Sequence, residues 1–442
     1  MKKIALLMLW LALASAFIGA RGQTAYQPTV PQSVVSSIPA SKTLSEVHRE
    51  TFEIVWSTVN ERHFDPTFGG VDWNKVRKQY APRLAEVKTD RELYALLQQM
   101  LGELHQSHFN IIPPEAIIED TAKEPPTGGL GVDVQYLDNQ ALITRVDDGS
   151  TGARAGLRPG FIIEQIDGTP VAHIIERFTT GKASPAIIRL RSARAIMTSL
   201  NGKPGTAVHL AYLDARDQAQ EATIKRARLK GELSPRFGSF PPQYTEFEAK
   251  RLAGAVGYIR FNIFSMSLME KISPAIRAMG RAPGLILDLR GNPGGVGNMS
   301  QLIAGLLTSE PSSLGAMHLR VGSINFNVSP QPNAFTGSVV ILMDGRSAST
   351  SEVFSSGLQE IGRAVVIGER SVGAALPSVL TKLPTGALFQ CAIADFKTPK
   401  GVLIEGRGVQ PDIEVKLTRA TLLAGRDAQL DAAIAQIQKL DQ

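Results

Sequence analysis

Residues 338–357 read SVVILMDGRSASTSEVFSSG, and this stretch predicts a buried strand, a tight turn and a helix. Its apolar run shows no alternation, as in parallel strands that are covered on both faces. Serines and other small residues fill the turn, and a helical pattern starts at Ser351. In α/β proteins such a turn lies at the carboxyl edge of the sheet, where ligands bind. We therefore expect a functional group among these serines.

A second strand and turn of this kind come earlier, in residues 284–298, which read GLILDLRGNPGGVGN. Exposed backbone N–H groups in a glycine-rich turn can bind an oxyanion. Further strands are expected at 255–262, 363–369 and 387–396, with helices at 268–279, 296–307 and 351–361. This alternation predicts an α/β core over residues 250–442, which ends in an amphipathic helix.

Helical periodicity predicts an N-terminal helical domain over residues 43–120. Asp72 is the expected N-cap of one helix. Thr89 and Glu92 form the sequence pattern of a capping box at another. Pro113 and Pro114 end the regular structure.

Short alternating strands predict a small β domain over residues 128–230. Turns are expected at Asp138–Asn139 and Asp167–Gly168. The basic stretch 175–194 receives no assignment.

The first residues have the pattern of a secretory signal peptide over 1–22, followed by a Pro/Ser/Thr-rich linker over 23–42. An uncleaved anchor helix is the alternative. The pattern predicts export to a periplasmic or extracellular location, with no membrane span left after cleavage. Cys391 is the only cysteine, which excludes intrachain disulfides and a cysteine metal cluster.

Charge and histidine spacing exclude other classes of protein. The chain of 442 residues has a formal charge of +6, but residues 1–22 carry three basic side chains and no acid, which leaves 44 basic against 41 acidic residues. That balance is too small to indicate nucleic-acid binding. The histidines lack metal-ligand spacing, so no metal or other cofactor is expected.

The β region resembles a PDZ domain through GLGV at residues 129–132 and STGARAGLRPGFIIEQIDG at residues 150–168. This resemblance implies that a chain-terminal carboxylate is bound by backbone N–H groups of the first motif. The implied peptide-binding residues are Gly129, Leu130, Gly131 and Val132.

Three motifs in order resemble the C-terminal processing (tail-specific) serine peptidase family: LILDLRGNPGG (285–295), GRSASTSEVFSSGLQEIGRAVVIGER (345–370) and EGRGVQPDIEV (405–415). The implied fold is multi-domain α/β: a ClpP/crotonase-like α/β core, an N-terminal helical domain and an inserted PDZ-like β domain. The family's nucleophile corresponds to Ser349, whereas Ser347 and Ser351 are interpreted as structural. Thr350 and either Gly294 or Gly295 would supply the oxyanion N–H groups.

The general base differs from that of most familiar members. Ala374 stands where those members have a lysine, and Lys382 falls in an alternating strand pattern. A lysine-less branch, similar to the tricorn core protease, instead uses a histidine from the helical region and a glutamate. That resemblance implies His108 as base, Glu405 as the acceptor that orients the histidine and Ser107 as a supporting residue.

His105 competes with His108 for the role of base, and Asp412 competes with Glu405. His105 is expected on the last turn of a helix, where a positive charge suits the helix dipole. Asp412 is interpreted as a turn former.

The predicted function is an exported serine endopeptidase that acts on unfolded polypeptides or on proteins with exposed C-termini. A catalytically inactive, peptide-binding scaffold is the alternative, because the usual lysine is missing. An esterase is disfavoured, since Ser349 lacks the G-x-S-x-G pattern of that class.

Overall fold

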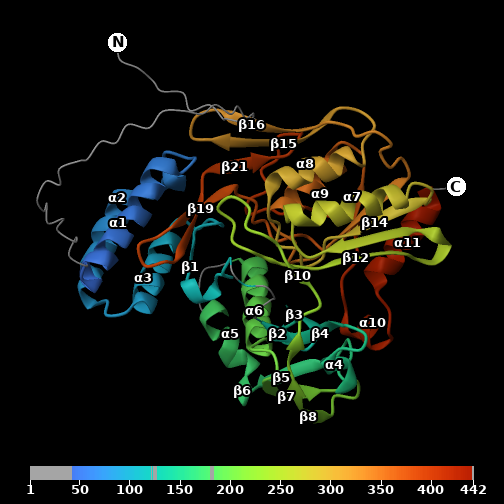
Figure 1. Cartoon of the computed structure of the whole chain (residues 1–442), viewed down its shortest axis with the longest axis horizontal. Helices are drawn as coiled ribbons and strands as arrows, with labels where there is room; N and C mark the ends of the chain where they lie inside the picture. The colour runs from blue at the N-terminus through green and yellow to red at the C-terminus, as the bar shows by residue number, and fades with distance from the viewer. Residues whose placement is uncertain (1–41, 121, 123–126, 180–183, 441–442) are drawn as a thin grey trace, which may run out of the picture. The chain divides into compact units, whose positions relative to one another are not determined.

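The computed structural model of the protein describes residues 42–120, 122, 127–179 and 184–440 (Figure 1). The expected signal peptide and nearly all of the expected linker therefore lie outside the described residues. The described residues from 43 onward form one compact unit. Within the described ranges, none of the helices has the length and apolarity that a membrane crossing requires.

Six strands form the central sheet, in the order β12 (Phe247–Arg251), β13 (Gly257–Phe261), β14 (Gly284–Asp288), β17 (Ser338–Met343), β18 (Val365–Gly368) and β22 (Ile413–Glu414). β12 runs antiparallel to β13, and the other neighbours are parallel. The turns after β14 and β17 therefore leave the sheet at the same edge. The apolar strands expected from the sequence are confirmed.

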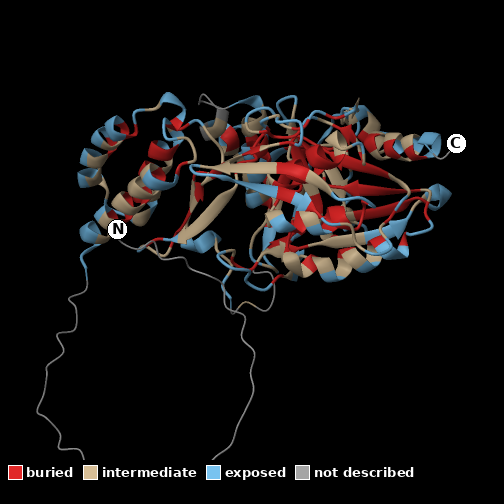
Figure 2. Ribbon diagram, turned by 90° about the horizontal axis from the view of Figure 1, so that it is seen from above, coloured by how far each residue is buried: buried red, intermediate tan, exposed pale blue. Residues whose placement is uncertain are grey.

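Helices cover both faces of this sheet, which explains why its central strands are apolar throughout. On one face Ile286, Val340 and Leu342 pack with Ile437 of α11 (Ala428–Leu440). The opposite face packs against α7 (Met269–Ala278), α8 (Gly297–Gly305) and α9 (Thr350–Glu360). Figure 2 shows these strands as the buried centre of the molecule.

The N-terminal helices are α1 (Leu44–Arg62), α2 (Trp73–Tyr80) and α3 (Asp90–Gly102). The predicted Asp72 cap and the Thr89–Glu92 capping box are confirmed. The expectation for His105 is wrong, because α3 ends at Gly102 and His105 lies beyond it, exposed and with a φ of 52°.

A short strand, β1 (Asn110–Ile112), follows these helices. It pairs antiparallel with β20 (Leu388–Ala392), which also pairs with β19 (Ser378–Lys382). The helices share one apolar cluster with this small sheet, in which Phe52 and Leu93 pack with Leu376 and Phe389. This pairing fixes the position of the residues just before β1.

The single strand expected at 387–396 is wrong in one respect. The run divides at Ile393 into β20 and β21 (Ala394–Lys397), and the two strands belong to different sheets. β21 joins β15 (Ser312–Leu319) and β16 (Ser323–Val328). The Ile393 N–H donates instead to Pro377 O.

The remaining β region is a sheet in the order β3 (Val132–Leu137), β4 (Gln140–Val146), β5 (Ile162–Ile166), β7 (Ala207–Leu213) and β8 (Ala219–Lys225). Its helices are α4 (Thr151–Arg154), α5 (Val171–Thr179) and α6 (Pro185–Leu200), and α6 packs beside β3. Asp138, Asn139 and Asp167 have positive φ, as expected for residues in tight turns.

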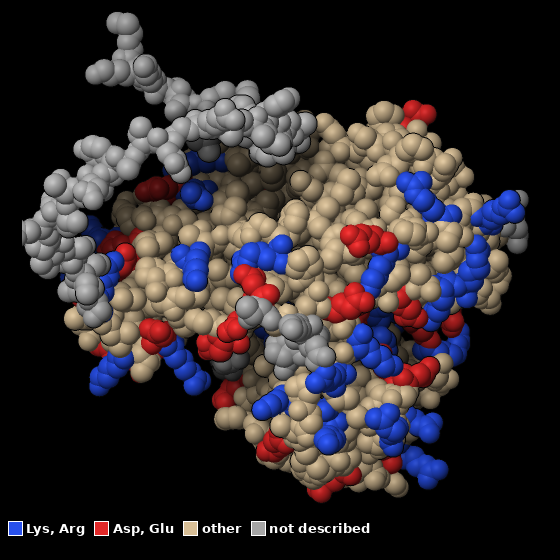
Figure 3. Space-filling view, viewed as in Figure 1, with Lys and Arg blue, Asp and Glu red and all other residues tan. Residues whose placement is uncertain are grey.

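Basic and acidic side chains of the described residues are interspersed on the face in Figure 3. The small net charge is thus not gathered into one basic stripe on that face.

Candidate active site

Ser349 lies in the turn between β17 and α9, with a φ of 55° and a ψ of −120°. This is a strained conformation for a residue with a Cβ, outside the small left-handed helical region. The Ser349 N–H donates to Ala374 O at 2.8 Å and to Glu352 Oε2 at 2.9 Å. Strain of this kind, held by surrounding contacts, is typical of functional positions.

The neighbouring serines are bonded within the turn. Ser347 Oγ is buried and donates to Leu289 O at 2.8 Å. Ser351 Oγ, also buried, donates to Asn292 O at 3.0 Å. Both contacts agree with a structural role, and they tie the serine turn to the glycine turn after β14.

The glycine turn lies directly behind Ser349. A Cβ added to Gly294 would lie 2.6 Å from Ser349 Cβ and 2.7 Å from Thr350 N, so only glycine fits there. The Gly294 N–H, however, donates to Asn292 Oδ1 at 2.9 Å. This bond favours Gly295 over Gly294 as an oxyanion donor, because the Gly294 N–H already has an acceptor.

Gly295 and Thr350 remain as the two oxyanion candidates. Thr350 Oγ1 donates to Gly295 O at 2.8 Å, which holds the two residues together. For neither backbone N–H is there a hydrogen-bond partner in the part of the chain that the structure describes. Thr350 is the first residue of α9, where N–H groups lack intrahelical partners.

Ser107, His108 and Glu405 form a connected chain. Ser107 Oγ lies 2.7 Å from His108 Nδ1 and 2.9 Å from Glu405 Oε2, and the Ser107 N–H donates to Glu405 Oε1 at 2.8 Å. The Ala375 N–H also donates to Glu405 Oε2, at 2.9 Å. Glu405 therefore reaches His108 through Ser107 rather than directly.

Ser349 and His108 line the same cavity, of about 400 Å³. Gly294, Gly295 and Thr350 line it as well, together with apolar side chains such as Phe264 and Leu376. The structure thus brings the expected nucleophile, base and oxyanion donors to one space, with Glu405 and Ser107 behind the histidine.

Burial controls the charge states of His108 and Glu405. Desolvation, with a smaller contribution from the positive charge of Arg194, lowers the pKa of His108 to about 4. Burial raises the pKa of Glu405, although the N–H groups of Ser107 and Ala375 favour its ionised form. His108 is therefore neutral at pH 7, as a general base must be.

The residue at the expected lysine position cannot act as a base. Ala374 is buried and packs with Leu190, Ala348 and Val372. Lys382 is exposed at the end of β19.

The expected peptide-binding loop lies between β2 (Gly128–Gly129) and β3. Gly131 has a φ of 69°, and the N–H groups of Leu130 and Gly131 have no hydrogen-bond partner among the described residues. Val132 begins β3, which is an edge strand of its sheet.

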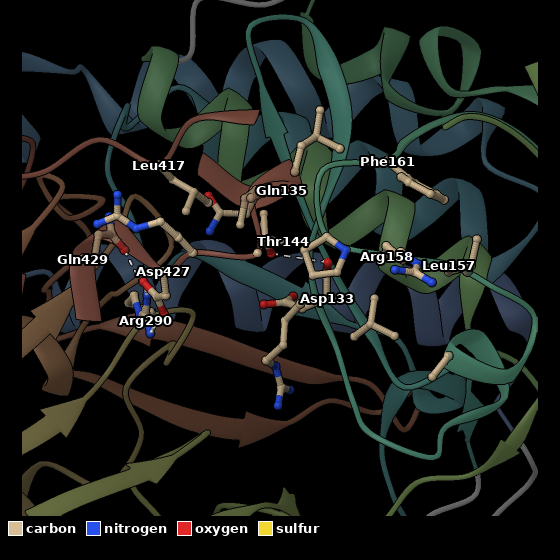
Figure 4. A pocket seen from close by; sticks show the side chains of 18 of the residues that line it. Asp133, Gln135, Thr144, Leu157, Arg158, Phe161, Arg290, Leu417, Asp427 and Gln429 are labelled. Carbon is tan, nitrogen blue, oxygen red and sulfur yellow. Dashed lines mark hydrogen bonds and ion pairs between the residues drawn. The ribbon is translucent and has the colours of Figure 1, made fainter. Parts of the chain in front are cut away.

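A second cavity, of about 840 Å³, has a different lining (Figure 4). Asp133 and Gln135 of β3 face it, as do Arg290 and Asp427 from the core and the C-terminal segment. Arg346 lies at its border and bonds both Asp133 oxygens. This cavity therefore borders the turn that carries Ser349.

Glu352 is a residue that sequence reasoning missed. It is fully buried, and its carboxylate accepts the Ser349 N–H. The available signal was the capping-box pattern STSE at 349–352, which places a glutamate three residues after the N-cap.

A strand–turn–helix unit that presents a serine to a cavity also lined by a histidine has two of the groups that a serine hydrolase needs. Residues 255–415 match peptidase family S41, and residues 45–102 match the tricorn protease C1 domain. The chain therefore has a peptidase family S41 domain preceded by a tricorn protease C1 domain, and it is a serine peptidase.

Several curated proteins are similar to most of this chain. A carboxyl-terminal-processing protease from Synechocystis is 28% identical over 388 residues, which is 86% of this chain and 84% of that protein. A putative tricorn protease homolog 2 from Streptomyces coelicolor is 25% identical over 397 residues, or 87% of this chain and 32% of that protein.

Two solved structures share the fold. The photosystem II D1 C-terminal processing protease has a TM-score of 0.56 at 20% identity, covering 86% of this chain and 98% of that chain. The tricorn protease has a TM-score of 0.53 at 19% identity, covering 91% of this chain and 37% of that chain.

Proposed function

We propose that this peptidase is an exported endopeptidase that uses Ser349 as nucleophile and His108 as general base, with Glu405 and Ser107 in support. The observation that carries the proposal is the hydrogen-bonded chain Glu405–Ser107–His108, whose histidine shares a cavity with Ser349. Family S41 peptidases act on polypeptides, so the reaction is hydrolysis of a peptide bond.

Ser107 selects the histidine tautomer. When its hydroxyl donates to Glu405 Oε2, the Ser107 oxygen is free to accept a hydrogen bond from His108 Nδ1–H. The Nε2 lone pair is then the basic one. The ionised Glu405 stabilises the imidazolium through the intervening hydroxyl.

The reaction follows from these positions. Ser349 Oγ attacks the substrate carbonyl carbon as its proton passes to His108 Nε2, and the Gly295 and Thr350 N–H groups bind the oxyanion. His108 then gives that proton to the leaving amine. Water, deprotonated by His108, attacks the acyl ester; the Ser349 Oγ–carbon bond breaks, His108 returns the proton to Ser349 Oγ, and the second product leaves as a carboxylic acid.

The β domain is proposed to be a PDZ-like module that binds the substrate's C-terminal carboxylate. The N–H groups of Leu130 and Gly131 support this role, because they have no partner among the described residues. Gly129 and Val132 flank them, and the edge strand β3 beside α6 could pair with an extended peptide. Amidation of a substrate's C-terminus should therefore raise KM.

The proposed export rests on the signal-peptide pattern of residues 1–22, which lie outside the described residues. Periplasmic or extracellular recovery of a chain that lacks those residues would support it. Recovery of the uncut chain in the cytoplasm would contradict it.

Two variants test the chemistry. Ser349→Ala and His108→Ala should each abolish cleavage of an unfolded polypeptide, and Ser349→Ala should also prevent covalent labelling by a fluorophosphonate. Full turnover by either variant would overturn the assignment. A wild-type protein that is never labelled would favour the inactive scaffold.

A further inference from the structure

Glu352 is a fully buried carboxylate held only by hydrogen bonds. Oε1 accepts from Ser371 Oγ at 2.5 Å and from the Gly373 N–H at 2.7 Å. Oε2 accepts from the Ser349 N–H at 2.9 Å and from the Ala374 N–H at 3.0 Å. Within the described ranges no Lys or Arg forms an ion pair with it. Burying an unpaired carboxylate is costly, so these four donors are what stabilise it.

One side of this carboxylate holds the proposed nucleophile. Ser349 has a backbone conformation that a non-glycine residue keeps only when its surroundings fix it. The Ser349 N–H is bonded by Glu352 and by Ala374 O, and the Ala374 N–H returns to Glu352. These bonds close a ring around the strained residue.

The other oxygen of this carboxylate, Oε1, is bonded to Ser371 and Gly373, which contact the segment that carries Glu405. Ser371 Oγ accepts the Val409 N–H at 2.7 Å, and Gly373 O accepts the Gly406 N–H at 2.8 Å. A Cβ on Gly408 would lie 2.6 Å from Ser371 O, so residues 371–373 and 406–409 are closely packed.

Residues 371–375 therefore bridge two carboxylates. Gly373 and Ala374 donate their N–H groups to Glu352, and the next residue, Ala375, donates to Glu405. The backbone at position 374 thus connects the two acids, although its side chain is only a methyl group.

We propose that Glu352 is a positioning residue, which holds Ser349 and the Glu405 segment in register through residues 371–375. This inference rests on the proposed function, because it assumes that Ser349 is the nucleophile. The buried Glu352 carboxylate would thus align the turn that carries Ser349 with the segment that carries Glu405.

Protonation of Glu352 should be visible as a change of activity with pH. Burial raises the pKa of Glu352 to about 7, against the opposing effect of its four hydrogen bonds. The groups that face it are the Ser371 hydroxyl and the N–H groups of Ser349, Gly373 and Ala374. A protonated carboxyl presents an O–H to these donors and cannot accept all four bonds. Activity should therefore fall as pH drops through about 7.

The test compares Glu352→Gln with Glu360→Gln. Glu360 lies on the same helix, where its carboxylate accepts hydrogen bonds from Thr398 and Lys400 away from the cavity. We expect Glu352→Gln to lower kcat and the rate of fluorophosphonate labelling roughly 100-fold with little change in KM, and to lose the pH dependence near 7. Glu360→Gln should stay within about twofold of wild type.

A second variant covers the case in which Glu352→Gln does not fold. Ser371→Ala keeps the Glu352 carboxylate but removes one of its hydrogen-bond donors and the acceptor of the Val409 N–H, so kcat should fall about 10-fold. The pKa of Glu352 should rise, and the loss of activity on acidification should therefore begin at a higher pH. Wild-type kcat and an unshifted pH profile in Ser371→Ala, or in a folded Glu352→Gln, would overturn the inference and leave Ser349 as nucleophile. Failure of the wild type to be labelled at Ser349 would instead overturn the proposed function, and this inference with it.

Discussion

Arg346 and Asp133 form a two-point ion pair that joins the turn before Ser349 to strand β3, with both N–O distances at 2.7 Å. Arg346 also contacts Asp344, whose carboxylate accepts the Gly291 and Ser347 N–H groups. Burial alone would raise the pKa of Asp133, but Arg346 holds it below the usual range. The pair thus connects the β domain to both turns of the site.

Asp133→Asn should destabilise the protein and slow catalysis. The change removes the two-point pair of a largely buried Arg346 and leaves it only the longer ion pair with Asp344, at 3.3 Å, which should cost about 3 kcal/mol. The measurement is the free energy of unfolding in urea, with kcat on an unfolded substrate.

The control is Asp120→Asn, which breaks a pair with Arg236 whose two side chains are 54% and 44% exposed. That change should cost less than about 1 kcal/mol. Equal effects of the two variants would show that the Arg346 pair has no special role.

Ser107→Ala should lower kcat/KM about 10- to 100-fold while His108→Ala lowers it further. The change removes the hydroxyl that lies between His108 Nδ1 and Glu405 Oε2, so the imidazole loses its orientation and its charge support. Steady-state kinetics on one peptide substrate would measure both variants. An unchanged kcat/KM in Ser107→Ala would show that the hydroxyl carries no part of the reaction.

The core could be predicted from the sequence because its signals are local. The unbroken apolar runs of β14 and β17 indicate strands covered on two faces, and the caps at Asp72 and Thr89 use short spacings. The break at Ile393 gave no such signal, since apolar residues continue through it.

Long-range contacts could not be derived in this way. Ser107 and Glu405 meet across 298 residues of sequence, and β1 pairs with β20 far along the chain. Family resemblance suggested Ser107, His108 and Glu405, but no spacing rule did. The network of Glu352 was missed because burial of a glutamate is unusual.

Gly294→Ala should abolish covalent labelling of Ser349. Gly294 has a φ of 93°, and the new Cβ would lie 2.6 Å from Ser349 Cβ and 2.8 Å from Ala348 O, so the turn would have to shift. The matched control is Gly102→Ala, because nothing lies within 4 Å of a Cβ there. Labelling of the Gly294 variant at the wild-type rate would mean that this close approach is not needed.

The contribution of His108 to the stability of the protein should decrease as pH falls from about 6.5 to 4. Its pKa is lowered from 6.5 to about 4 by burial and by Arg194, so the unfolded chain binds a proton before the folded one does. His108→Asn should remove this part of the pH dependence, worth up to about 3 kcal/mol. Urea unfolding at several pH values measures the difference, with His173→Asn at an exposed helix position as control. Parallel curves for wild type and His108→Asn would contradict the prediction.

Ala374→Lys should not restore activity to a His108→Ala variant. The Ala374 methyl group packs with Leu190, Ala348 and Val372, so a lysine side chain would have to displace this cluster. Overpacking a buried site usually costs about 1–3 kcal/mol, and an ammonium group there would also be desolvated. The experiment measures kcat and the unfolding free energy of Ala374→Lys alone and combined with His108→Ala. We expect lower stability in both variants and no turnover in the double variant. Recovery of turnover there would show that the cavity still accepts a lysine base, and that the Glu405–Ser107–His108 chain is not the sole way to activate Ser349.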